Sequence, residues 1–341
     1  MTEALYRLGM KNSLLISTVC DDISGRYIRE ESRKIGMNVS QLHTITKKSV
    51  TTGTYCAVFH ASGEINVALG NMRAHDFITP ELIQQNLSTL ADSEFCVIDA
   101  DIPSETISFI CTYCENNNIP VWFNPTDLRK CYKLIEANSL SKITYISPNI
   151  KELFTIFRLT LQADKSLDLD EKKDLNTIFL KYKESVNQLE HFQFDELKKC
   201  LKYLLKFVPF IVLTRGSKEL ILASAFELTP NAKRQLPSKS SMSSIKKAAF
   251  KPQLLLYPVA ELKENERISN VSGAGDSTSS GIICGILKDL SLNAIIYNGL
   301  AAAKLTLMSD RTVSEQLDSL GLDLVEGLVA ENQSNIKTFL L

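Results

Sequence analysis

Short apolar runs alternate with amphipathic stretches along most of the chain. Buried strands are predicted for the apolar runs at residues 13–19, 95–99, 120–124, 143–147, 208–213 and 254–258. Helices are predicted for the amphipathic stretches at residues 22–35, 80–91, 103–117, 126–137, 277–289 and 292–308. Strands separated by helices of this length indicate an α/β fold with a doubly wound, mostly parallel sheet.

Two further strand-like runs differ because almost nothing separates them. Residues 54–59 and 65–69 are joined by the short polar segment 61–64, which contains a glycine. This spacing predicts an antiparallel hairpin that leaves the main sheet.

Composition limits the classes of partner and compartment. The chain has 341 residues, of which 44% are hydrophobic and 23% are charged, and its net charge is −1. This near-neutral balance predicts neither a nucleic-acid nor a membrane partner. The beginning of the chain lacks a signal-peptide pattern, and eight scattered cysteines suit a reducing compartment. We therefore expect a cytoplasmic protein, with a mitochondrial location left open.

The segment 270–277, Asn-Val-Ser-Gly-Ala-Gly-Asp-Ser, is the strongest chemical signal in the chain. Gly273, Ala274 and Gly275 stand at the start of a predicted helix, where unpaired backbone N–H groups and the helix dipole favour an anion such as phosphate. Asp276 would repel that phosphate unless it accepts a proton from an attacking hydroxyl. The alternative is a tight turn with an aspartate at the helix start.

A second pattern, Asn149-x-x-Glu152, follows the predicted strand at residues 143–147. The two side chains share one face of a helical turn, which suits a hydrated Mg²⁺ beside nucleotide phosphates. The alternative is a capping box, in which the same residues only close the helix start. Asp99 ends another predicted strand, at the sheet edge where α/β folds bind ligands, and its alternative is a helix cap.

The run 270–283 resembles the C-terminal signature of the ribokinase-like carbohydrate and nucleoside kinases, the PfkB family. The resemblance implies that Gly273, Ala274 and Gly275 form an anion hole and that Asp276 is the catalytic base. It further implies a site at other positions of the chain. The implied residues are Thr214, Gly216 and Asn149 for ATP, Glu152 and Asn149 for Mg²⁺ through water, and Thr52, Gly53 and Asp99 for the substrate.

The resemblance also implies the domain organisation. We expect one ribokinase-like kinase domain over residues 1–328, with a small β lid at about 38–72, followed by a C-terminal tail at 329–341. The family has an earlier strand and a Gly-Gly turn that contact the sugar, whereas this sequence starts inside the following helix, which ends at Arg7-Leu8-Gly9. We therefore expect an N-terminally incomplete domain.

Within the family, the sequence is most similar to pseudouridine kinases. The similar features include Tyr257-Pro258, the segment 147–153 and Arg311-Thr312-Val313. This implies ATP-dependent phosphorylation of the 5′-hydroxyl of pseudouridine, with Mg²⁺ and also K⁺ as expected ions. The alternatives are a nucleotide-binding pseudokinase, a truncated isoform, and a ribokinase- or adenosine-type kinase. A homodimer is compatible with the sequence.

Overall fold

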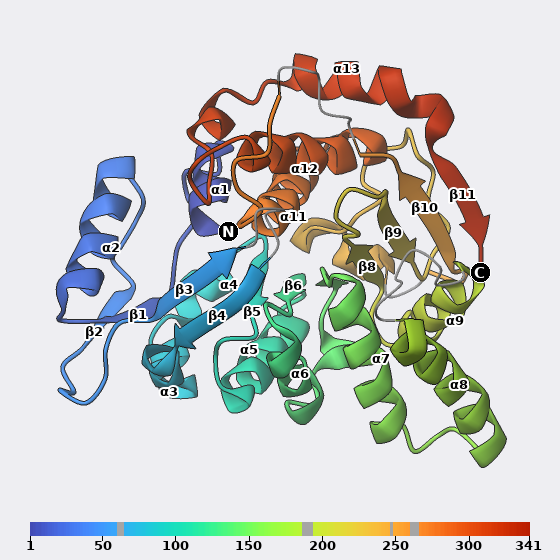
Figure 1. Ribbon diagram of the computed structural model, residues 1–341, viewed down its shortest axis with the longest axis horizontal. Coiled ribbons are helices and arrows are strands. Elements are labelled where there is room, and N and C mark those ends of the chain that lie inside the picture. Colours follow the sequence, from blue (N-terminus) through green and yellow to red (C-terminus); the bar gives the residue numbers. More distant parts are fainter. Residues whose placement is uncertain (60–64, 186–193, 246–247, 260–265) are drawn as a thin grey trace. The chain divides into compact units, whose positions relative to one another are not determined.

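The computed structural model describes residues 1–59, 65–185, 194–245, 248–259 and 266–341, with the backbone alone at residues 59, 65, 66, 68, 182–185, 244 and 245. The chain forms two compact units, which we describe separately. The first unit comprises Met1–Asn86, Thr229–Leu236 and Val259–Ser334. The second comprises Leu87–Leu228, Pro237–Pro258 and Asn335–Leu341. Figure 1 labels most of the helices and strands of both units.

A seven-stranded sheet in the order β11-β10-β9-β8-β7-β6-β5 forms the centre of the second unit (Figure 1). Strands β5 to β8 are parallel, whereas β9, β10 and β11 add antiparallel strands at one side. The strands are β5 (Cys96–Asp99), β6 (Val121–Asn124), β7 (Tyr145–Ile146), β8 (Phe210–Leu213), β9 (Leu220–Ser224), β10 (Gln253–Tyr257) and β11 (Lys337–Leu340). The α/β class expected from the alternating pattern is thus confirmed.

Stacked aromatic side chains on adjacent strands fill the middle of this sheet. The ring of Tyr145 lies 5.2 Å from the ring of Trp122 and 5.2 Å from that of Phe210, and all three side chains are fully buried. The Tyr145 hydroxyl donates to the Pro237 carbonyl, so this polar group is also satisfied. Offset aromatic pairs of this kind add to the stability gained from apolar burial alone.

Helices connect the strands of the second unit. They are α4 (Leu87–Ala91), α5 (Ser104–Asn116), η2 (Leu128–Lys130), α6 (Tyr132–Glu136), η3 (Leu140–Lys142), α7 (Ile150–Ala163), α8 (Leu169–Ser185), α9 (Phe194–Leu204), η5 (Lys239–Ser241) and α10 (Met242–Ile245). The helix expected over 126–137 is divided between η2 and α6. Thr126 has a φ of +65°, a left-handed conformation that no α-helix contains.

The first unit contains two small sheets and the helix pair that carries the glycine-rich motif. Strands β1 (Ser17–Cys20) and β2 (Leu42–Ile45) are parallel, and β3 (Thr54–Phe59) and β4 (Ile65–Asn71) form the expected antiparallel hairpin. Its connecting turn lies outside the described residues. The helices are α1 (Thr2–Arg7), α2 (Ile23–Ile35), η1 (Arg73–Phe77), α3 (Pro80–Gln84), α11 (Ala274–Leu287), α12 (Leu292–Leu307), η6 (Glu315–Ser319) and α13 (Leu322–Asn332).

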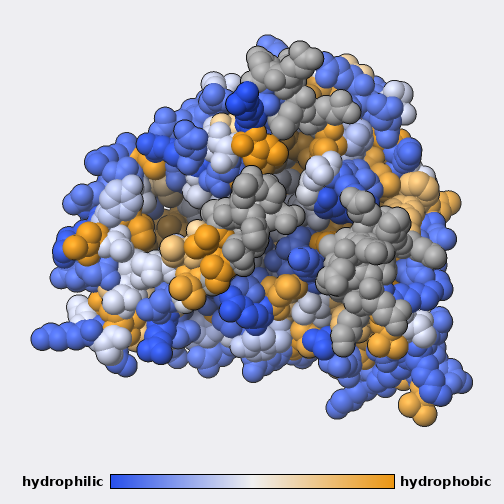
Figure 2. Space-filling view, viewed as in Figure 1, coloured by the Kyte–Doolittle hydropathy of each residue, from blue (hydrophilic) through white to orange (hydrophobic). Residues whose placement is uncertain are grey.

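The β3–β4 hairpin exposes apolar side chains. Val58, Val67 and Leu69 are 53%, 50% and 74% exposed. Pairing of Val58 with Val67, together with the two-residue repeat along β4, places all three on one face of the hairpin. Figure 2 shows hydrophobic surface over this part of the molecule.

Helices α11 and α12 pack so closely at Gly281 and Gly299 that a Cβ at either position would collide with the backbone of the opposite helix. A Cβ on Gly281 would lie 2.6 Å from the Asn298 carbonyl oxygen, and one on Gly299 would lie 2.7 Å from the Thr278 carbonyl oxygen. The Asn298 side chain also donates to the Gly281 carbonyl at 2.7 Å. Backbone contact of this kind holds α11, and the residues at its start, in one position relative to α12.

The residues after 328 differ from the expected tail. They complete α13, continue through η7 (Gln333–Asn335) and form strand β11, which pairs antiparallel with β10. Phe339 packs edge-to-face on Phe194 of α9 with ring centroids 5.2 Å apart, which gives this short strand an apolar contact.

Among the described residues, no helix is long and apolar enough to cross a membrane.

Candidate active site

Gly273 begins the glycine-rich turn of the first unit and has a backbone conformation that suits glycine. Its φ is +83°, and a Cβ at this position would lie 1.9 Å from the Thr312 carbonyl oxygen. Other L-amino acids rarely adopt this φ, and none could approach the Thr312 backbone so closely. Gly273 therefore allows the loop that follows α12 to press against the start of α11.

The segment before the turn is attached to the end of α12. The N–H groups of Ser269 and Asn270 donate to the Leu307 carbonyl at 2.8 and 3.2 Å, and the Asn270 side chain accepts from the Ser272 N–H. On the helix side, the Ser277 hydroxyl and the Thr306 hydroxyl of α12 are 2.7 Å apart and buried. The turn is thus held from both sides before any ligand arrives.

The turn leaves donors available at the start of α11. The first backbone bond of the helix runs from the Ser277 N–H to the Gly273 carbonyl, and no hydrogen bond from the Ala274 or Gly275 N–H is found among the described residues. A Cβ on Gly275 would meet no atom within 4 Å, so open space adjoins the turn here. Free N–H groups and the positive end of the helix dipole favour an anion at this place.

Asp276 occupies the first turn of α11 beside these donors. Its side chain is 41% exposed, and its Oδ2 atom lies 3.4 Å from the amino group of Met1. An accessible carboxylate next to an anion-binding turn can accept a proton from a hydroxyl while the turn stabilises negative charge on the group that this hydroxyl attacks. This combination is what phosphoryl transfer to an alcohol requires.

Asn149 and Glu152 form a capping box at the start of α7 in the second unit. Asn149 Oδ1 accepts from the N–H groups of Lys151 and Glu152 at 2.9 and 3.0 Å, and Glu152 Oε2 accepts from the Asn149 N–H at 2.9 Å. The structural alternative stated above is therefore present. The backbone bond of this cap is made to Oε2 of the carboxylate.

The environment of Glu152 disfavours its negative charge. The residue is only 6% exposed, and burial raises the pKa of its carboxyl group, as does the nearby charge of Asp127, while the Asn149 N–H opposes the shift. A buried carboxylate with a second carboxylate nearby gains from a bound cation. Oxygen donors are also what Mg²⁺ prefers, so the residues present fit this ion.

Thr214 and Gly216 follow β8 in the same unit. The Thr214 N–H donates to the Pro148 carbonyl at 3.1 Å, and Thr214 forms an isolated parallel bridge with Asn149. Gly216 has a φ of +64°, and a Cβ there would meet no atom within 4 Å. The structure thus brings Thr214 beside Asn149, at the carboxyl ends of the parallel strands β7 and β8, where α/β sheets bind ligands.

Thr52 and Gly53 lie beside the carboxyl end of β1 in the first unit. Thr52 is 2% exposed, and its hydroxyl donates to Asp22 at 2.7 Å and accepts from the Cys20 N–H at 2.8 Å. Its own N–H donates to Asp22 Oδ2 at 2.8 Å. These bonds occupy the Thr52 hydroxyl within the protein, so a substrate contact from this residue stays a prediction.

Asp99 ends β5 in the second unit. It pairs in register with Asn124 of β6, and its Oδ1 atom accepts from the Asp101 N–H at 2.8 Å. The other predicted residues form three local groups, to which Asp99 is not assigned. The groups are 273–276 in the first unit, Thr52 with Gly53 in the first unit, and Asn149 with Glu152, Thr214 and Gly216 in the second.

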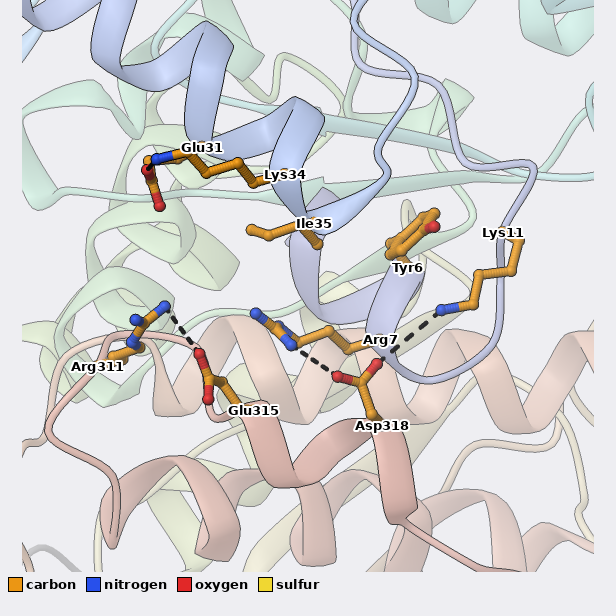
Figure 3. A pocket seen from close by; sticks show the side chains of 9 residues that line it. All are labelled: Tyr6, Arg7, Lys11, Glu31, Lys34, Ile35, Arg311, Glu315 and Asp318. Carbon is orange, nitrogen blue, oxygen red and sulfur yellow. Dashed lines mark hydrogen bonds and ion pairs between the residues drawn. The ribbon is translucent and has the colours of Figure 1, made fainter.

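A cavity of about 400 Å³ in the first unit does not belong to these groups (Figure 3). On its wall Arg7 pairs with Asp318 at 2.7 Å, and Arg311 pairs with Glu315 at 3.0 Å. Lys34 and Glu31 form a further pair at its rim, 2.6 Å apart. Lys11 also lines the cavity and lies 3.9 Å from Asp318, so four basic and three acidic side chains leave the lining with only a small net positive charge and little attraction to a phosphate.

Sequence reasoning missed three residues that shape these groups. Thr312 presses on Gly273, Asp22 binds Thr52, and His75 lies against Gly53. Asp22 is also the N-cap of α2, since it accepts from the Gly25 N–H at 2.8 Å. Thr312 contributes a backbone carbonyl and His75 carries no motif, so nothing in the sequence identified either.

Residues 1–238 match the family model described as pfkB family carbohydrate kinase. The chain belongs to the pfkB family. The match ends before the glycine-rich turn, which the longer alignments with individual relatives cover. Members of this family are kinases that transfer phosphate from ATP to an alcohol group, so the chain is assigned to the phosphotransferases.

Individual pfkB relatives give the same assignment at low identity. The chain is 23% identical to pseudouridine kinase of Arabidopsis thaliana over 96% of its own length and 84% of that protein. It is 26% identical to pseudouridine kinase of Escherichia coli (strain K12) over 48% of its own length and 50% of that protein. The alignment with the bacterial relative thus spans about half the length of each chain.

The fold of the pfkB chain agrees with solved kinase structures. Ribokinase of Arabidopsis thaliana, complexed with ribose and ATP, matches with a TM-score of 0.64 at 14% identity, covering 96% of this chain and 85% of that chain. A likeness at this identity shows the ribokinase-like fold, and it confirms the fold class expected from the sequence.

Proposed function

We propose that this pfkB kinase transfers the γ-phosphate of ATP to the 5′-hydroxyl of pseudouridine. The observation that carries the proposal is the pairing of an accessible Asp276 with the open donors of Ala274 and Gly275 at the start of α11. The substrate is suggested by the pseudouridine kinases among the relatives, one of which aligns over 96% of this chain.

In the proposed reaction, Asp276 accepts the proton of the attacking 5′-hydroxyl as the bond from its oxygen to the γ-phosphorus forms. ADP leaves, and the donors at the start of α11 stabilise the negative charge on the transferred group. Mg²⁺, where bound, would neutralise charge on the ATP phosphates, and Glu152 with Asn149 would hold it through water. Thr214 and Gly216 would contact the nucleotide.

The test is ATP consumption by the purified chain with pseudouridine, ribose or adenosine offered separately, at fixed Mg²⁺ and with or without K⁺. Turnover with pseudouridine and little with the others is expected. Asp276→Asn should abolish turnover while ATP binding, measured by calorimetry, stays close to that of the unchanged chain. Unaltered turnover in this variant would refute the assignment of Asp276 as base.

A different outcome would favour the second candidate, a nucleotide-binding protein without kinase activity. The Met1 amino group lies 3.4 Å from Asp276 Oδ2, where an attacking hydroxyl would have to approach. A folded chain that binds ATP but phosphorylates none of the three acceptors would support this candidate. Preference for ribose or adenosine would instead change only the proposed substrate.

A further inference from the structure

Among the described residues of the first unit, His75 is one of two histidines with a ring nitrogen that is buried without a partner. Its Nδ1 atom is shielded from solvent and makes no hydrogen bond among the described residues. Buried polar atoms almost always have a partner, so each exception requires a reason. A ring that is held ready for a ligand is one such reason.

The absence of a partner on Nδ1 decides where the proton of the neutral ring sits. A buried N–H group without an acceptor is costly, whereas a buried lone pair without a donor is less so. The neutral imidazole carries one N–H and one lone pair. The favoured tautomer therefore places the lone pair on Nδ1 and the proton on Nε2.

The Nε2 side of the ring faces Gly53. A Cβ built on Gly53 would lie 3.4 Å from His75 Nε2 and 3.2 Å from the sulfur of Met72. Nε2 itself makes no hydrogen bond among the described residues, and it is not among their fully buried unpartnered atoms. A donor for which no acceptor is found in the described part of the chain thus lies beside a residue that has no side chain to cover it.

Both residues are held at the end of a parallel strand. Thr52, next to Gly53, bonds to Cys20 and Asp22 at the carboxyl end of β1. The backbone of η1 is attached to the same strand, because the Thr18 hydroxyl donates to the Ala74 carbonyl at 2.6 Å. The carboxyl ends of parallel strands are where α/β folds bind their ligands.

We infer that His75 is a specificity-determining residue that donates a hydrogen bond from Nε2 to an oxygen of the phosphate acceptor. This inference rests on the proposed function for the identity of the acceptor. The oxygen is either a hydroxyl of the sugar or a carbonyl of the base, since both accept the same bond.

The experiment compares His75→Leu, His75→Gln and His43→Leu with the unchanged chain. Leucine removes the donor, glutamine returns an N–H close to the position of Nε2, and His43 is a matched control on β2 whose Nε2 is also buried without a partner. Binding of pseudouridine and of ribose is measured by calorimetry without ATP, and turnover is measured separately.

His75→Leu should weaken acceptor binding and raise its KM about five- to tenfold, the usual effect of losing one neutral hydrogen bond. The KM for ATP should not change, His75→Gln should recover most of the loss, and His43→Leu should match the unchanged chain. Weakening for both acceptors would identify a sugar hydroxyl as the partner, and weakening for pseudouridine alone would identify the base.

Two results would overturn the inference. One is acceptor binding by His75→Leu equal to that of the unchanged chain. The other is a rise in the KM for ATP together with a lower unfolding midpoint, which would indicate a purely structural residue. Binding without turnover by the unchanged chain would refute the proposed function alone, because the calorimetric comparison still tests His75.

Discussion

The two glycines of the turn before Asp276 should respond differently to alanine, although they are two residues apart. Gly273→Ala adds a Cβ 1.9 Å from the Thr312 carbonyl oxygen, about 1.5 Å short of the 3.4 Å at which ordinary contact begins. It also places alanine at a φ of +83°. Gly275→Ala adds a Cβ that meets nothing within 4 Å.

The structure allows the cost of each change to be worked out. The left-handed conformation costs alanine roughly 1–2 kcal/mol, and forcing apart the Thr312 contact adds about 1–3 kcal/mol. Gly273→Ala should therefore destabilise the fold by roughly 2–5 kcal/mol. Gly275→Ala should be neutral or should stabilise by up to about 1 kcal/mol, because alanine is the better residue in a helical turn.

The effects of the two substitutions on kcat should have the opposite order: in the folded chain, Gly275→Ala should lower it more than Gly273→Ala. In a folded Gly275→Ala chain, the new methyl group occupies the space next to the free N–H groups and should keep a phosphate away from them. Loss of one such donor interaction lowers kcat by about 10²–10³-fold. Gly273→Ala should lose activity chiefly in proportion to the unfolded fraction.

Thermal unfolding followed by circular dichroism, with turnover measured on the same samples, separates the two effects. The midpoint of Gly273→Ala should fall by roughly 4–20 °C, at about 2–4 °C per kcal/mol, and that of Gly275→Ala should stay within about 4 °C of the unchanged chain. A stable and fully active Gly275→Ala chain would refute the placement of the phosphate at this turn.

Three further changes test the other groups. Asn149→Ala should lower the free energy of unfolding by about 0.5–2 kcal/mol in a denaturant titration, because the N-cap of α7 is lost. The raised pKa of Glu152 means that the folded state binds this proton more tightly than the unfolded state, so stability falls as the pH rises above 4.5. Glu152→Gln should therefore flatten the pH dependence of stability above pH 4.5. An unchanged slope would contradict the burial argument. Thr52→Val should destabilise by about 1–3 kcal/mol, since it leaves the Cys20 N–H without its acceptor, and an exposed Thr51→Val change should not.

The parts of the site that are local in sequence could be predicted from it. The glycine-rich turn and Asp276 lie within one segment of eight residues, so an anion-binding helix start can be recognised there from the sequence. Asn149 and Glu152 are three residues apart, and both of their interpretations, the capping box and the cation site, could be stated in advance. The structure shows that the cap forms and that Glu152 is buried within it.

The parts that depend on tertiary contacts could not be predicted. The requirement for glycine at 273 comes from the carbonyl of Thr312, which is 39 residues away in sequence and contributes no side chain. Strand β11 lies in the segment expected as a tail, and it pairs with β10 and is contacted through Phe339 by Phe194. Neither contact leaves a periodic pattern in the sequence.

For Thr52 and Gly53, the family resemblance predicts the region of the substrate site but not the role of each residue in it. The resemblance placed both residues near the substrate, yet the Thr52 hydroxyl is used to join Asp22 and Cys20. Because these bonds hold the backbone at the end of β1, the neighbouring glycine keeps its bare side against His75. A substitution at Thr52 should therefore act on substrate binding through the position of Gly53, whereas one at His75 should act on it directly.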